Sequence, residues 1–297
     1  MGQLLCKHED QLGRGLTYDL WKGFPAHEIL VLKDANEGIG CMLDPASPPY
    51  AKAGVGSTGM PIGNGICAFV DTTDAYITGL THAQYPGGHG FRMGGTTDNQ
   101  AAELQFCGGA EPFVISDGTT LAAEVRELIF EVQFRLSTIT TNELGLFMGL
   151  AGRAALDGNF LADNVPTAAT PGVADIDMIG LFMDHADTSG LDIMYQLAGQ
   201  EAVTHEAAWK TLAIDTWYTF GMRFLPVTKK LNFYWGTGDR VTKLAIDDNP
   251  VLSTDIDDTT FPDNQGLAPT FAVKLGGQAE YLDIRAFACA QRAYAAD

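Results

Sequence analysis

The chain has 297 residues, of which 46% are hydrophobic, and it carries 37 acidic against 18 basic residues, a formal net charge of −19. The apolar content suffices for a sizeable core and argues against global disorder. The negative charge argues against nucleic acid as a partner, because phosphates would be repelled. A membrane partner is not expected either, since no run approaches the roughly 18 apolar residues that cross a bilayer.

The N-terminal stretch, residues 1–15, lacks an apolar run of useful length, so we expect no secretory signal. Gly2 follows Met1 as at a myristoylated start, but Cys6 stands where that motif needs Ser or Thr. The cysteines are odd in number and match no zinc-site spacing, so we expect reduced, mostly buried thiols in a protein that folds in a reducing cytoplasm. The five are Cys6, Cys41, Cys67, Cys107 and Cys289.

Residues 1–60 are expected to form an extended, mostly irregular N-terminal arm and linker. The stretch 44–65 is rich in Gly and Pro, which is typical of a linker. Because the arm has too few periodic apolar residues for a core of its own, its order must come from docking on another surface. The apolar residues available for this interaction are Trp21, Phe24, Ile29, Leu30, Val31 and Leu32.

Residues 61–297 show dense strand signals separated by Gly-rich turns. In residues 128–136, large apolar side chains alternate with Glu131, Gln133 and Arg135, which predicts a half-buried strand with a solvated polar face. Residues 206–212 are the best candidate for one or two helical turns. Strands at this density predict an all-β domain, either a β-sandwich or a barrel.

Residues 215–240 predict an antiparallel hairpin. Apolar side chains recur at every second position on both sides of a turn at 226–230 that contains proline and lysine. The apolar face of this hairpin is expected to fill the core together with that of the strand at 128–136. The residues predicted to lie between two sheets are Phe130, Val132, Phe134, Tyr218, Phe220, Met222, Phe224, Phe233 and Phe271.

No catalytic or cofactor-binding residue stands out in the sequence. "GVGSTG" at 54–59 has the letters of a dinucleotide-binding fingerprint, but it lacks the preceding strand and following helix that the motif needs. We find no carboxylate pair of a retaining glycosidase, no hydrolase serine elbow and no Cys–His pair. We therefore expect that the protein is not an enzyme and binds no cofactor.

A metal site is not expected, although residues 247–264 form an acidic loop. Its carboxylates could offer oxygen ligands to Ca²⁺, but they lack EF-hand spacing, and a solvated acidic loop is the simpler interpretation. His82, His89 and His185 are interpreted as solvated or turn-capping loop residues. The weak candidates for metal ligands are Asp255, Asp257, Asp258 and Asp263.

The order of the segments resembles that of concanavalin A-like (laminin G-like) jelly-roll proteins found among the virion structural proteins of tailed bacteriophages. The resemblance covers about residues 62–292. It rests on "EPFVISDGTTL" followed by "FEVQFRLS", and on a hairpin with the pattern W-Y-x-F-G-x-R-F…L-x-F-Y. The family's Y-x-D-G turn is "YWGTGDR" here, so ligand roles of that Asp are not carried over. The resemblance implies a jelly-roll β-sandwich domain over residues 61–297.

The resemblance also implies a capsid decoration or cement protein on the virion exterior, assembled in the host bacterial cytoplasm. Its partners would be the major capsid protein and copies of itself, in a homo-oligomer such as a trimer, contacted through the arm. One alternative is a glycan-binding module that binds host-surface glycans with exposed aromatic residues. Another, a glycan hydrolase, would need two facing carboxylates in a cleft. The aromatic residues considered for sugar stacking, with core packing as the competing interpretation, are Trp209, Trp217, Tyr234 and Trp235.

Overall fold

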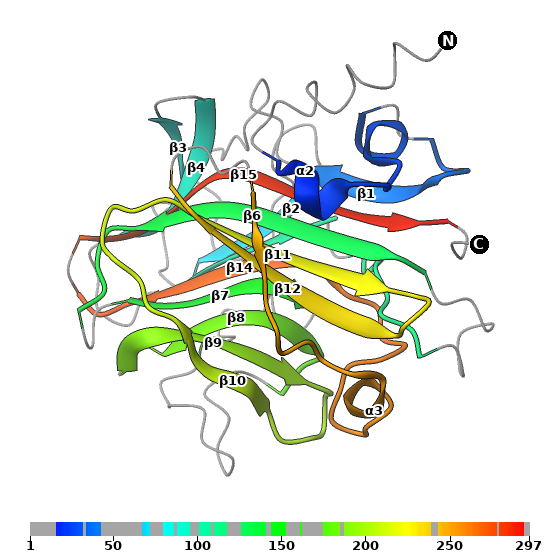
Figure 1. The fold of residues 1–297 in the computed structure, drawn as a ribbon. Helices are drawn as coiled ribbons and strands as arrows, with labels where there is room; N and C mark the ends of the chain where they lie inside the picture. The colour runs from blue at the N-terminus through cyan, green and yellow to red at the C-terminus, as the bar shows by residue number, and fades with distance from the viewer. Residues whose placement is uncertain are drawn as a thin grey trace.

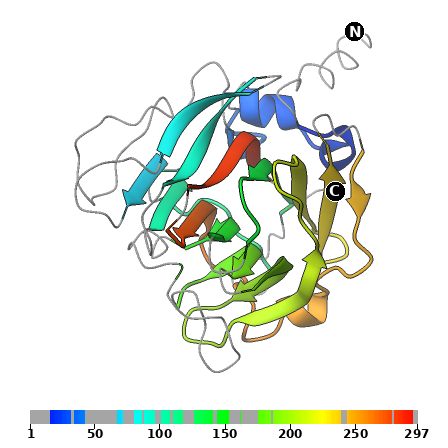
Figure 2. The ribbon, with the colours of Figure 1, turned by 90° about the vertical axis from the view of Figure 1, so that its left-hand side faces the viewer.

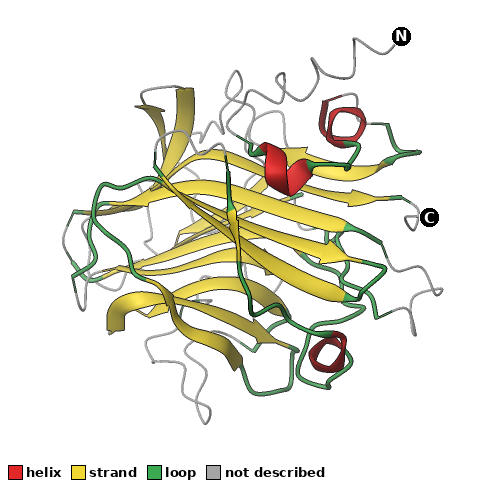
Figure 3. Cartoon of the chain, viewed as in Figure 1, coloured by secondary structure: helices red, strands yellow, loops and turns green. Residues whose placement is uncertain are grey.

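The protein is built almost entirely of antiparallel strands, which form two sheets that face each other (Figure 1 and Figure 3). This confirms the predicted all-β sandwich. No helix within the described ranges is long and apolar enough to cross a membrane. The computed structural model describes residues 16–31, 34–42, 67–71, 80–85, 88–95, 101–107, 110–117, 126–140, 144–152, 161, 175–184, 187–238, 243–277 and 279–293.

The first sheet, which we call sheet A, has the strand order β13-β12-β11-β6-β15-β4-β3, and β1 pairs separately with β15. Strands that are distant in the sequence therefore lie side by side, as the long central strands β6, β11 and β15 do. The strands are β1 (Gly38–Met42), β3 (Leu80–Tyr85), β4 (Gly88–Gly95), β6 (Leu128–Leu136), β11 (Tyr218–Leu225), β12 (Lys230–Thr237), β13 (Ala245–Ile246) and β15 (Glu280–Arg292).

The second sheet, sheet B, has the order β10-β9-β8-β7-β14-β5-β2. The helical elements between the strands are short: α2 (Tyr18–Trp21), the π-helical turn η1 (His27–Val31) and α3 (Ser253–Ile256). The strands of sheet B are β2 (Cys67–Asp71), β5 (Ala101–Phe106), β7 (Leu144–Ala151), β8 (Met178–Asp184), β9 (Asp187–Gln196), β10 (Val203–Lys210) and β14 (Ala268–Leu275).

The main hydrophobic core lies between the two sheets, and every residue predicted to lie there is buried in it. The side chains alternate along each strand, so one face of each sheet supplies the core. Aromatic rings connect the two sheets: the ring centroid of Phe130 of sheet A lies 6.2 Å from that of Phe271 of sheet B. Within sheet A, the ring centroids of Phe130 and Phe220 lie 6.1 Å apart.

The predicted hairpin is confirmed as β11 and β12, which pair antiparallel along their whole length. Its strands end at Leu225 and resume at Lys230, as the turn signal indicates. In contrast, the helical turn expected at 206–212 is wrong, because most of this stretch belongs to β10, which pairs with β9. Burial of Trp209 in the core and pairing with β9 outweigh the local helix preference.

The N-terminal segment 16–31 packs on the outer face of sheet A, the face away from sheet B (Figure 1 and Figure 2). The chain then adds β1 to sheet A through five residue pairs with β15, from Gly38 opposite Arg292 to Met42 opposite Ala288. Part of the expected arm is therefore ordered on the sandwich itself. The domain boundary expected at residue 60 stays a prediction, since residues 43–66 lie outside the described ranges, as does the motif at 54–59.

Candidate functional site

The outer face of sheet A is divided into two parts. One part is apolar and carries the N-terminal segment, whose side chains pack on Ile129, Ala288 and Ala290. The other part, nearer the opposite end of the same strands, carries polar and aromatic side chains from three neighbouring strands and the loop before β11. We call these side chains the arginine strip: Arg92, Arg135, Arg285, Asp283, Gln133 and Trp217.

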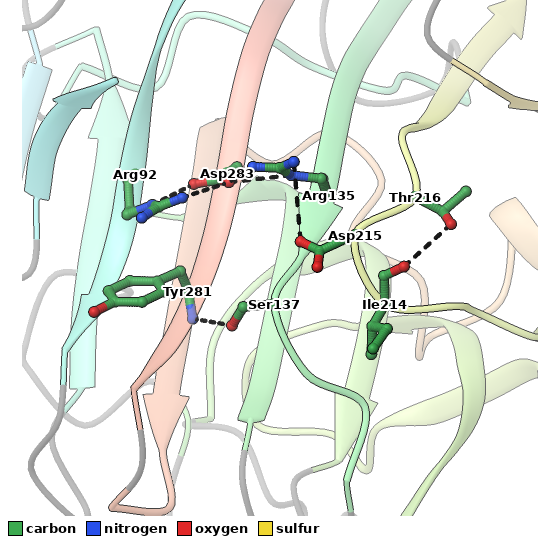
Figure 4. Close-up of polar contacts among 8 residues, drawn as sticks. All are labelled: Arg92, Arg135, Ser137, Ile214, Asp215, Thr216, Tyr281 and Asp283. Atoms are coloured by element: carbon green, nitrogen blue, oxygen red, sulfur yellow. Dashed lines mark hydrogen bonds and ion pairs between the residues drawn. The ribbon is translucent and has the colours of Figure 1, made fainter. Parts of the chain in front are cut away.

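The first row of the arginine strip runs straight across three strands (Figure 4). Asp283 of β15 is the direct cross-strand partner of Arg92 on β4 and of Arg135 on β6, so the register places one carboxylate between two guanidinium groups. Arg92 Nε lies 2.6 Å from Asp283 Oδ1, and Arg135 Nη2 lies 2.7 Å from Asp283 Oδ2. Asp283 is almost completely buried, whereas the arginine side chains are 34% and 23% exposed.

The second row is formed around a β-bulge in β15. The register with β6 shifts between Ile284 and Ala286, so Arg285 has no residue directly opposite it on β6, and strand alternation places it on the same face as Asp283. Arg285 Nε donates a 2.6 Å hydrogen bond to Gln133 Oε1, and Gln133 Nε2 donates a 3.1 Å hydrogen bond to Thr219 Oγ1 of β11. Arg285 therefore adds a third guanidinium group beside the first row.

Each of the three guanidinium groups makes a cation–π contact with an aromatic ring. The Cζ atom of Arg285 lies 4.2 Å from the ring centroid of Trp217, and the Cζ atom of Arg135 lies 5.2 Å from it. Trp217 is itself buried. Arg92 lies 4.4 Å from the ring centroid of Tyr281, whose main chain exchanges hydrogen bonds with Ser137. Cation–π contacts and hydrogen bonds together restrict the rotamers of these arginines.

The charge of the arginine strip is opposite to that of the whole chain. Three guanidinium groups face Asp283 and Asp215, whose Oδ1 lies 3.9 Å from Arg135 Nη1 and whose side chain is 69% exposed (Figure 4). Counted over the arginine strip and Asp215 alone, the charge is positive, on a protein of net charge −19. Planar guanidinium groups with fixed orientation are suited to bind carboxylate or sulfate groups with two parallel hydrogen bonds.

The sequence did not single out most of this surface. The alternation in 128–136 pointed to Gln133 and Arg135 as outward residues, but the prediction that this face is solvated is wrong: Glu131 and Gln133 are buried. The available signal in the sequence was the spacing of Asp283 and Arg285, which are two residues apart in the last strand and therefore share one face of it. The cross-strand register that joins them to Arg92 could not be deduced from the sequence.

Two of the four candidate metal ligands are engaged in hydrogen bonds within their own loop. Within the described ranges, no group of three or more His, Cys, Asp or Glu side chains is arranged to hold a metal ion. Asp255 accepts a hydrogen bond from the Leu252 main chain at the start of α3, and Asp258 accepts one from the main chain of Thr260. The side chains of His82 and His89 lie outside the described part, as does His185.

Asp263, another of these candidates, lies close to a second carboxylate. Asn264 Nδ2 donates hydrogen bonds to both Asp117 and Asp263, so their oxygens lie within about 5–6 Å of each other. Burial, followed by the charge of Asp117, raises the pKa of Asp263. Ser116 donates to Asn264 Oδ1 and completes this network, which ties the loop 257–267 to the segment 110–117.

The residues expected to dock the arm have partners within this chain. Trp21, Phe24, Ile29 and Leu30 are buried in the cluster on sheet A, and the side chains of Val31 and Leu32 lie outside the described part. Leu20 joins them, and its main-chain oxygen accepts a 2.8 Å hydrogen bond from Arg223 Nη1. Docking of this segment on a neighbouring subunit stays a prediction, but these four side chains are already covered.

The aromatic residues considered for sugar stacking lie mostly in the core. Trp209 and Trp217 are buried, and Trp209 contacts the ring of Trp235 at 5.3 Å between centroids. Tyr234 and Trp235 are partly buried. No exposed tryptophan platform is therefore present among the residues that the structure describes. Recognition of a ligand on sheet A would depend on guanidinium groups rather than on open rings.

The fold is that of the concanavalin A-like sandwich seen in legume lectins. Peanut lectin, solved with a nine-residue peptide, superposes with a TM-score of 0.52 at 11% sequence identity, covering 86% of this chain and 97% of the lectin. Arcelin-5, a lectin-like defence protein from Phaseolus vulgaris, gives a TM-score of 0.49 at 8% identity and covers 86% of this chain and 99% of its own. The score of arcelin-5 is below 0.5, so the comparison depends on peanut lectin.

At 11% identity, the similarity to peanut lectin concerns the fold alone. The sequence matches no protein-family model and no curated protein. The concanavalin A-like part of the predicted resemblance is thus confirmed, whereas nothing in these comparisons points to a virion or a bacteriophage.

Proposed function

We propose that the protein is a non-catalytic, glycan-binding β-sandwich that binds acidic sugars at the arginine strip. The observation that carries this proposal is the row Arg92–Asp283–Arg135 with Arg285 beside it, three guanidinium groups fixed on one sheet face. The lectin-like fold supports a sugar ligand, because peanut lectin, which shares the fold, is a lectin. Glycan binding is the alternative that the sequence offered beside the capsid role, although that alternative used exposed aromatic residues rather than arginines.

The chemistry of the arginine strip favours an anionic sugar over a neutral one. A guanidinium group forms charge-assisted hydrogen bonds with carboxylate or sulfate, which are roughly twice as strong as neutral ones. Repulsion from the distant acidic residues is screened, because the Debye length is about 8 Å at physiological ionic strength. Uronate and sulfate groups, which present planar or tripodal oxygens, are therefore the expected points of contact.

A glycan array tests this proposal with matched variants. The wild type should bind immobilised uronate or sulfated glycans and not their neutral counterparts. Arg285→Gln removes one guanidinium group and should abolish this signal or lower it about tenfold. Lys230→Gln removes an exposed charge from the far end of the β11–β12 hairpin and should change nothing. Binding of neutral glycans that is insensitive to Arg285→Gln would overturn the assignment of the site.

The capsid decoration role stays a prediction that no observation on the fold or the surface favours. The same holds for the major capsid protein as a partner, for a homo-oligomer and for a location on the virion exterior. Particle binding by a protein whose arginine strip has been neutralised would support the capsid role over glycan binding.

A further inference from the structure

A second carboxylate lies beside the arginine strip, on the loop that leads into β11 (Figure 4). Asp215 Oδ1 lies 3.9 Å from Arg135 Nη1, and the Asp215 side chain is 69% exposed. Asp283, in contrast, has a side chain that is 4% exposed, and its Oδ2 lies 2.7 Å from Arg135 Nη2. Arg135 thus has one buried acidic partner that fixes its orientation and one acidic partner that is open to solvent.

The backbone that carries Asp215 is held in place. Its main-chain nitrogen donates a 2.8 Å hydrogen bond to the main-chain oxygen of Leu136, the last residue of β6. Asp215 has a φ of 55°, in the left-handed region that Asp and Asn tolerate better than most other residues with a side chain. Trp217, two residues later, contacts Arg135 through its ring. The Asp215 carboxylate can therefore leave Arg135 by rotation of its own side chain, while the loop stays where it is.

The contact between Asp215 and Arg135 is of a kind that a ligand can replace. Its N–O separation of 3.9 Å is longer than that of a charge-assisted hydrogen bond, which is about 2.7–2.9 Å. An exposed ion pair contributes little to the stability of the fold, because water and salt screen it. An oxygen of a ligand carboxylate or sulfate that approaches Arg135 to hydrogen-bonding distance would therefore interact more strongly than Asp215 does.

We propose that Asp215 is a specificity-determining residue of the arginine strip, because its carboxylate occupies the position of a ligand anion beside Arg135 and is displaced on binding. This inference rests on the proposed function and narrows its ligand class. A ligand with a single charge only replaces one carboxylate at Arg135 with another. A glycan with several carboxylate or sulfate groups also contacts Arg92 and Arg285, which offsets the lost contact. The arginine strip therefore selects polyanionic glycans over singly charged sugars.

A titration with sodium sulfate at constant ionic strength tests the competition without a sugar. The Nε–H signals of the arginines in proton–nitrogen NMR spectra report anion binding, and Arg135→Gln identifies the signal of Arg135 by its loss. Asp215→Asn keeps the size of the side chain and its tolerance of the left-handed backbone, but removes the charge. This variant should bind sulfate about three- to fivefold more tightly than the wild type. Glu201→Gln removes an exposed charge beside β10 of sheet B and should bind sulfate as the wild type does.

Isothermal titration with oligogalacturonate and with galacturonate separates this inference from the proposed function. The wild type should bind the oligomer at least about tenfold more tightly than the single sugar, and Asp215→Asn should bind the oligomer more tightly still. Sulfate binding that is undetectable, unchanged or weaker in Asp215→Asn would overturn the inference, whether or not acidic sugars bind. A gain that Glu201→Gln shares would also overturn it, as a general effect of net charge. Tighter sulfate binding by Asp215→Asn without any binding of oligogalacturonate would support the competition and contradict the proposed glycan ligand.

Discussion

The indole of Trp21 donates a hydrogen bond to the carboxyl group of Glu131, a residue 110 positions away on the outer face of β6. Thr17 donates to the same carboxyl group through its main-chain nitrogen, at 3.0 Å, and through its hydroxyl group, at 3.1 Å. Glu131 is fully buried by the N-terminal segment, and burial raises its pKa to about 8 despite these hydrogen bonds. The N-terminal segment is thus attached to sheet A by hydrogen bonds from Thr17 and Trp21 to the buried carboxyl group of Glu131.

This arrangement predicts that the protein loses stability as pH rises. The unfolded chain releases the Glu131 proton near the usual pKa of 4.5, whereas the folded chain retains it up to about pH 8. The stabilisation is therefore complete below about pH 4.5 and is lost as pH rises through about 8, with a slope of at most about 1.4 kcal/mol per pH unit. Urea unfolding at pH 5.5, 7 and 8.5 measures this loss.

Glu131→Gln is the matched control for this pH dependence. The amide preserves the shape of the side chain, can accept from the Trp21 indole and donate to the Thr17 hydroxyl group, and does not titrate. As pH rises from 5.5 to 8.5, the unfolding free energy of the wild type should fall relative to that of Glu131→Gln. A difference that is constant with pH would show that Glu131 does not titrate in this range.

A second prediction tests the docking of the N-terminal segment. A Cβ added at Gly221 of β11 would come within 2.5 Å of Leu20 Cδ2, so Gly221→Ala should displace the segment. Amide hydrogens of residues 16–31 should exchange faster, while those of β6 and β15 stay protected. Gly152→Ala is the control, because its Cβ would meet atoms at 3.5 Å or more. Unchanged exchange in Gly221→Ala would contradict the tight packing at this position.

The sequence predicted the sandwich because its signals are local. Alternation along β6, β11 and β12 and the turn at 226–230 each depend on a few neighbouring residues, so they could be interpreted one segment at a time. The role of Glu131 is different. A charged residue at an outward position of a strand predicts solvent exposure, and only the docking of a segment 110 residues away changes that.

The arginine strip escaped prediction for a related reason. It depends on the register of three strands that are far apart in the sequence. One shift of register by a single residue would move Asp283 to the other face of the sheet. Cys41 and Cys289 likewise face each other across β1 and β15, whereas the sequence showed only scattered cysteines.

The largest effect on the free energy of unfolding is expected from a substitution in the core. Phe220 is fully buried between the sheets and contacts the rings of Phe130, Trp209 and Phe233. Phe220→Ala should lower the unfolding free energy by about 3–5 kcal/mol, because it removes buried area and leaves a cavity. Val227→Ala, at a site that is 84% exposed in the hairpin turn, should change it by less than about 0.5 kcal/mol. Urea unfolding at constant pH compares the two variants.

The most direct measurement of the central claim is isothermal titration of the wild type and Arg135→Gln with an oligogalacturonate and with its methyl ester. The ester keeps the sugar chain and removes the charge of every carboxylate, so it isolates the contribution of the guanidinium groups. We predict that the wild type binds the free acid at least about tenfold more tightly than the ester, and that Arg135→Gln removes most of this preference. Equal affinity for acid and ester, or a preference that persists in Arg135→Gln and Arg285→Gln, would contradict the assignment of the arginine strip as an acidic-glycan site.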